Sequence, residues 1–175
     1  MALKQKIQQD LNIAAKGKKP LEVLILRQLL AAILNKEKEK RFRLFKAETD
    51  LVDEAKASSP AFANAQLIDE EVIEAISSEI KKRKEAILAF EGGGRQDLVD
   101  KETKEKEILE KYLPEQLSEQ EIKKLTEVAV EKVEAKELKD MGKVMQELLP
   151  QVKGKADGSL VSKIVKELLN PDGRN

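Results

Sequence analysis

The chain of 175 residues contains no cysteine, no histidine and no tryptophan. Without cysteine it has no disulfides, no thiolate nucleophile and no zinc–thiolate site. The absence of histidine removes the commonest general base and metal ligand of proteins. Aromatic residues make up only 3% of the chain, which argues against base stacking as the main way of binding a nucleic acid. We therefore expect no metal site and no cofactor.

The net charge does not indicate a class of ligand, because 33 basic residues balance 33 acidic ones. No apolar run reaches the length of a membrane span, and the first ten residues lack the hydrophobic region of a signal peptide. These features predict a soluble cytoplasmic protein that does not contact a membrane.

Apolar residues recur at helical spacing along almost the whole chain, and no stretch alternates as a strand does. Helices are expected at 3–16, 20–46, 69–91, 97–113, 118–135, 140–149 and 159–169. The second of these places Leu24, Leu30 and Leu34 at helical spacing. Ser118 and Glu121 form a capping-box pattern at the start of the fifth helix, and Pro150 is expected to end the sixth. The segment 50–67 is expected to be irregular or a broken helix.

The sequence therefore predicts an all-α protein with two domains. A long helical hairpin should dominate residues 1–115, where three consecutive glycines separate the third helix from the fourth. A compact three-helix domain should follow over residues 116–175. Pro114 and the helix-capping pattern at Ser118 mark the boundary between the two domains.

A polar cluster is expected inside the hairpin. Arg83 lies in the middle of the apolar face of the third helix, and Glu102 and Glu105 lie on the apolar face of the fourth. An antiparallel hairpin would bring the three residues level with one another. One interpretation is a structural ion pair that fixes the register of the hairpin. The other is an arginine that carboxylates hold rigid to receive a phosphate or an acidic partner.

The loop 153–158, with the sequence KGKADG, combines two lysines, two glycines and an aspartate. Gly154 and Gly158 permit positive φ and close approach of the backbone, and Lys153 and Lys155 add positive charge. Asp157 is placed to cap the helix that follows. Lys143, Lys163 and Lys166 add further positive charge nearby in the chain. This pattern favours an anion-binding surface, although Gly142 and Gly154 are also explained by close helix packing.

Two basic runs, 36–46 and 81–84, lie on predicted helices. Such runs are usually solvated helix faces, and the alternative is an electrostatic contact with an RNA backbone. The chain has no phosphate-binding loop of the GxxxxGK[ST] type and no GxSxG nucleophile elbow. We find no catalytic centre in the sequence.

Four stretches carry a resemblance to a known family: LRQLLAAILN at 26–35, IDEEVIEAISSEIKKRKEAILAFEGGGRQDLV at 68–99, YLPEQLSEQEI at 112–122 and MGKVMQELLPQVKGKADG at 141–158. Together they make the chain similar to the GatB/YqeY family. That family comprises the tail domain of the GatB component of the aspartyl/glutamyl-tRNA amidotransferase and the freestanding YqeY-like proteins.

The resemblance implies a protein linked to translation that binds tRNA or assists tRNA-dependent transamidation, a carbon–nitrogen ligation with glutamine as the amide donor. It also implies an amidotransferase or an aminoacyl-tRNA synthetase as a protein partner. The residues expected to bind tRNA phosphates are Lys143, Lys153, Lys155, Lys163 and Arg95, with Gly154 and Gly158 shaping the loop. The alternative is a helical protein–protein interaction module that does not bind RNA.

Overall fold

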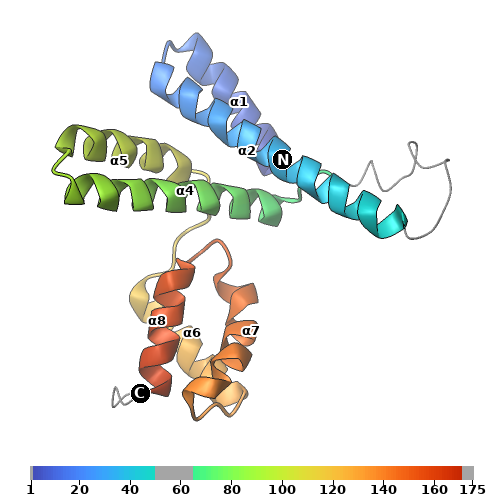
Figure 1. Cartoon of the computed structure of the whole chain (residues 1–175), viewed down its shortest axis with the longest axis vertical. Helices are drawn as coiled ribbons and strands as arrows, with labels where there is room; N and C mark the ends of the chain where they lie inside the picture. Colours follow the sequence, from blue (N-terminus) through green and yellow to red (C-terminus); the bar gives the residue numbers. More distant parts are fainter. Residues whose placement is uncertain (1, 50–64, 171–175) are drawn as a thin grey trace. The chain divides into compact units, whose positions relative to one another are not determined.

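The computed structural model describes residues 2–49 and 65–170 (Figure 1). These residues form seven α-helices and one short 3-10 helix, with no strand among them, which confirms the all-α prediction. The chain divides into two compact units, Met1–Tyr112 and Leu113–Asn175. No helix in the described part of the chain combines the length and the apolar character needed to cross a membrane. Most of the segment expected to be irregular, 50–67, lies outside the described residues.

Two helical hairpins make up the N-terminal unit. Helices α1 (Leu3–Lys16) and α2 (Pro20–Thr49) form the first hairpin, and α4 (Asp69–Gly92) and α5 (Gln96–Glu110) form the second. Gly94 allows the tight turn of the second hairpin because its φ of 66° belongs to the left-handed region.

Apolar faces of these helices form the core of the N-terminal unit. Its fully buried members are Ile7 of α1, Val72 and Ile76 of α4, Leu109 of α5, and Ile25, Leu26, Leu29 and Ile33 of α2. Leu24 and Leu34 of α2 are each 47% exposed. Almost every residue from 21 to 34 is apolar, so spacing alone does not identify the buried face of α2.

The C-terminal unit, called the tail unit below, contains α6 (Glu119–Lys132), α7 (Met141–Val152) and α8 (Gly158–Leu169). The short 3-10 helix Leu138–Asp140 precedes α7. Ile122 of α6, Val144 and Leu148 of α7 and Val161 of α8 are completely buried in one shared core.

At Ser118 the tail unit has the helix start that the sequence predicts, but at Pro150 it does not have the predicted helix end. Ser118 accepts a hydrogen bond from the Glu121 amide, and the Glu121 carboxylate accepts one from the Ser118 amide, as a capping box requires. The prediction that Pro150 ends its helix is wrong, because α7 continues to Val152. Pro150 lies in the last turn, where the missing N–H removes one bond, to the carbonyl of the exposed residue Gln146.

Candidate functional site

The loop between α7 and α8 contains both lysines that the sequence singled out for anion binding. Lys153 and Lys155 are exposed, and between them Gly154 has a φ of 73°. A side chain at position 154 would be strained in this left-handed conformation. Asp157 caps α8 by accepting a hydrogen bond of 2.9 Å from the Ser159 amide. The backbone therefore turns sharply at Gly154 and presents the two lysines to solvent.

The segment before α6 holds this loop in place. The Leu117 amide donates to the carbonyl of Lys155 at 2.7 Å. The side-chain amide of Gln116 donates to the carbonyls of Gly154 and Pro114, both at 2.8 Å. The YLPEQLSEQEI stretch at 112–122 and the loop at 153–158 are thus in direct contact. The loop is anchored at two consecutive carbonyls, which fixes the positions from which its lysine side chains start.

Three of the six backbone amides of the loop 153–158 donate hydrogen bonds within the protein. Lys153 donates to Leu149, and Lys155 and Ala156 both donate to Val152. The Asp157 carboxylate occupies the Ser159 amide and adds a negative charge at the start of α8. An anion at this loop would therefore depend mainly on the lysine side chains, since half of the loop amides are used and the Asp157 carboxylate repels it.

The other lysines of the predicted site lie at different distances from the loop. Lys163 is exposed in the second turn of α8, and its Nζ lies 3.8 Å from Glu167. Lys143 belongs to the first turn of α7, ten residues before Lys153, or about 15 Å along the helix. Lys166 follows Lys163 by three residues on α8 and is also exposed. Lys153 and Lys155 thus follow the end of α7, Lys143 lies at the start of that helix, and Lys163 lies midway along α8.

Lys143 also has a partner within the tail unit. Its Nζ lies 2.9 Å from the Asp140 carboxylate, which also accepts from the Lys136 amide at 3.2 Å. Both hydrogen bonds lower the pKa of Asp140, and the one from Lys143 has the larger effect. An anion would have to compete with Asp140 for Lys143.

The three glycines in and near α7 and α8 differ in whether the backbone requires glycine. Gly154 is required by its positive φ, whereas Gly142 and Gly158 have nothing within 4 Å of the place where a side chain would begin. Close helix packing therefore does not explain Gly142.

Arg95 belongs to the N-terminal unit, at the turn before α5. Its guanidinium donates to both carboxylate oxygens of Asp97, at 2.9 and 2.8 Å. This hydrogen-bonded pair raises the pKa of Arg95 and lowers the pKa of Asp97. Because the fork of the guanidinium already binds a carboxylate, a phosphate would have to displace Asp97.

Arg83 is partly buried and has polar partners from three helices. It lies 3.4 Å from Glu105 of α5 and 3.4 Å from Glu79 of its own helix, and it donates to Gln28 of α2 at 2.8 Å. The sequence predicted Glu102 as a partner, but Glu79 and Gln28 take the remaining positions around the guanidinium. Glu79, four residues before Arg83, could have been found from helix spacing. No feature of the sequence pointed to Gln28.

The arrangement of Arg83 fits the structural interpretation better than the phosphate-receiving one. Its side chain is only 13% exposed and its Nε is buried without a hydrogen-bond partner. A ligand would have little access to such a guanidinium. Within residues 2–49 and 65–170, no group of three or more acidic side chains is placed to hold a metal ion.

Comparison with known proteins gives one family. The family model described as Yqey-like protein matches residues 4–169, which span both units. No curated protein matches the chain significantly.

Proposed function

We propose, because the chain belongs to the YqeY-like family, that it is an accessory protein that binds tRNA through the phosphate backbone. The four family-like stretches resemble the tail domain of the amidotransferase component, which supports tRNA as the ligand. We assign tRNA binding to this chain and the chemistry of any transamidation to an amidotransferase or aminoacyl-tRNA synthetase partner.

The observation that carries this proposal is the anchored loop with its exposed Lys153 and Lys155. An ammonium group at the end of a flexible stem suits a phosphate as a point charge and does not read a base. The backbone amides of Lys153, Lys155 and Ala156 already donate to carbonyls of the tail unit. Binding should therefore depend on charge and shape rather than on RNA sequence, and it should weaken steeply with salt.

The test is binding of purified tRNA at several salt concentrations by the protein and by the variant Lys153→Glu/Lys155→Glu. A matched control is Lys123→Glu/Lys124→Glu, which makes the same change of charge on an exposed face of α6. The loop variant should bind at least about tenfold more weakly, with a shallower dependence on salt, and the control should bind nearly as the original protein does.

Equal binding by the loop variant and the original protein would overturn this assignment. Equal losses in both variants would show that only the net charge of the tail unit matters. Absence of tRNA binding by the original protein would leave the helical protein-interaction module as the function to pursue.

A further inference from the structure

We propose that α2 carries a second RNA contact, in which Phe42 and Phe45 stack on unpaired bases while Lys38 and Arg41 attract the phosphates beside them. This inference rests on the proposed function for the identity of RNA as the ligand. It assigns to the N-terminal unit a task different from that of the tail loop, namely the recognition of single-stranded rather than folded RNA.

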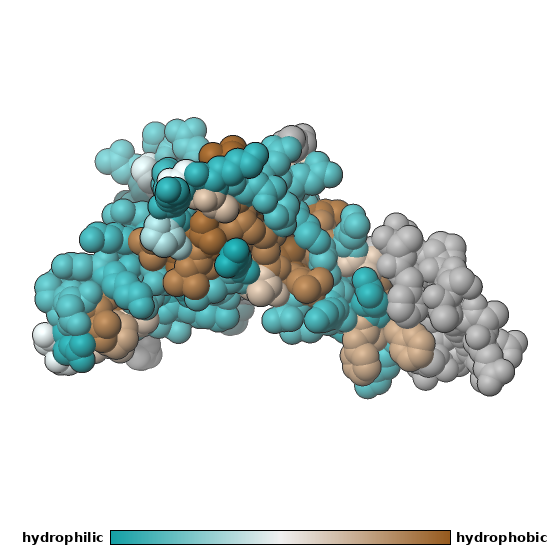
Figure 2. Space-filling view, turned by 90° about the horizontal axis from the view of Figure 1, so that it is seen from above, coloured by the Kyte–Doolittle hydropathy of each residue, from teal (hydrophilic) through white to brown (hydrophobic). Residues whose placement is uncertain are grey.

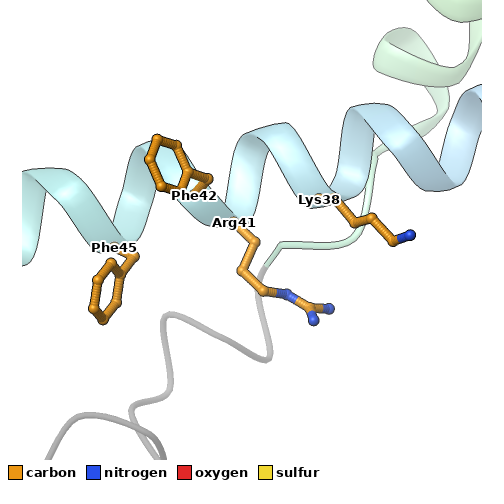
Figure 3. Close-up of a pocket in the computed structure, with 4 residues that line it drawn as sticks. All are labelled: Lys38, Arg41, Phe42 and Phe45. Carbon is orange, nitrogen blue, oxygen red and sulfur yellow. The ribbon is translucent and has the colours of Figure 1, made fainter.

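The four residues follow one stripe of α2. Positions 38, 41, 42 and 45 have the spacing i, i+3, i+4 and i+7, which places them on one side of a helix. They line a shallow pocket of about 300 Å³. Figure 3 shows Phe45, Arg41 and Lys38 directed to one edge of this stripe and Phe42 to the other. The volume lies at the lower end of the range for ligand sites and suits a base better than a whole cofactor.

Exposure of the two phenylalanines is the unusual feature. Phe42 is 66% exposed and Phe45 is 41% exposed, although the chain has only four phenylalanines in all. A helix face that only needs to be solvated gains nothing from aromatic rings, since exposing them opposes the hydrophobic effect. Apolar side chains also reach the surface elsewhere in the molecule, where Figure 2 shows a continuous hydrophobic area bordered by hydrophilic residues. The pair on α2 differs because both of its exposed apolar side chains are aromatic.

The charge of this part of α2 complements an anion. Residues 36–46 contain six basic residues and two glutamates. One of these glutamates, Glu37, is turned inward, where it accepts two hydrogen bonds from Lys4 at 2.7 and 2.8 Å. Lys4 thus neutralises Glu37, and Lys40 of the run pairs with Glu71 at 2.7 Å. The positive surface that remains comes from the exposed side chains of Lys38, Arg41 and Arg43, beside one exposed glutamate, Glu39.

Aromatic rings next to cations are the combination that binds single-stranded nucleic acids. Bases stack on the rings whatever their sequence, and the cations follow the backbone. The guanidinium of Arg41 can itself lie flat against a base. A purely apolar partner would not need the cations, and an acidic protein partner would not need two rings.

The experiment measures the binding of two probes, an unstructured oligoadenylate and a folded tRNA, by fluorescence anisotropy. The variant Phe42→Leu/Phe45→Leu keeps the apolar surface and removes the rings. It should bind oligoadenylate about tenfold or more weakly than the original protein. The variant Leu24→Ala/Leu34→Ala removes two half-exposed apolar side chains from the same helix and should keep the binding. Helical circular dichroism checks that each variant is folded.

The two proposals fail in different ways. Oligoadenylate binding that survives Phe42→Leu/Phe45→Leu would overturn the stacking site, whatever Lys153→Glu/Lys155→Glu does to tRNA binding. Retained tRNA binding in that lysine variant would overturn the tail-loop assignment alone. If the original protein binds no oligoadenylate, the stacking site is also overturned, and a hydrophobic protein partner becomes the occupant to test.

Discussion

The side-chain amide of Gln116 lies 2.8 Å from the carbonyl oxygen of Gly154, so a residue before α6 ties down the loop between α7 and α8. Together with the bond from the Leu117 amide to Lys155, this contact joins two parts of the sequence that the family resemblance singled out separately. The loop is therefore held by two groups outside it, the side chain of Gln116 and the backbone amide of Leu117.

Gln116→Ala should destabilise the tail unit by about 0.5–1.5 kcal/mol, since it removes the donors of two hydrogen bonds. Urea unfolding followed by circular dichroism measures the loss. Gln146→Ala is the control, because Gln146 is an exposed glutamine on α7 and alanine suits a helix. An equal effect of the two substitutions would contradict the role of Gln116.

Gly154→Ala and Gly158→Ala should change stability in opposite directions. Alanine at position 154 must adopt a φ near 73°, which costs about 1–2 kcal/mol. At position 158 a side chain meets open space at the start of α8, and alanine should stabilise by about 0.4–1 kcal/mol. Thermal unfolding of the two variants tests this contrast. Equal losses in both would show that the loop needs glycine for another reason.

Arg83→Ala should destabilise the N-terminal unit by about 3 kcal/mol, because it leaves the buried Glu105 without its cation. Glu105→Gln should also destabilise, whereas Glu102→Gln should change stability little, since Glu102 is not a partner of Arg83. Denaturant unfolding of the three variants separates these cases. A loss below about 1 kcal/mol for Arg83→Ala would contradict a buried ion pair at this position.

Stability of the N-terminal unit should fall at alkaline pH through Tyr112. Burial raises the pKa of Tyr112, and the hydrogen bond of 2.9 Å that its hydroxyl donates to Asp10 raises it further. A raised pKa in the folded state means that the stabilisation is complete below the unfolded pKa of about 10 and is lost as pH rises above it.

Ultraviolet absorbance of the phenolate measures this titration directly, because Tyr112 is the single tyrosine and the chain has no tryptophan. Asp10→Asn should bring the titration to a lower pH, since it removes the carboxylate. An ordinary pKa for Tyr112 in the original protein would show that the ring is not held as described.

Residues that act through their neighbours in sequence were predictable. Ser118 and Glu121 form their capping box, and Asp157 caps α8. Each of these effects operates within a few residues of the chain. The end of α7 was not predicted, because a proline in the last turn costs one hydrogen bond and the core contacts of Leu148 and Val152 outweigh it.

Features that depend on distant residues could not be derived from the sequence. Gln28 lies 55 residues from Arg83 in the sequence, and no sequence pattern around either residue predicts their hydrogen bond. The exposure of the phenylalanines of α2 was not predicted either, since a low aromatic content does not say which rings are buried. Only the inward direction of Glu37 and the exposure of Phe42 reveal a cationic and aromatic face.

The hydrogen bond from the Leu117 amide gives the tail unit a reporter of its own. Leu117 belongs to no helix, so its amide exchanges with solvent deuterium only when the contact with Lys155, far along the chain, opens. Tyr112, in contrast, belongs to the N-terminal unit. Deuterium uptake at one residue and phenolate absorbance at the other therefore follow the opening of the two units separately within the same intact molecule.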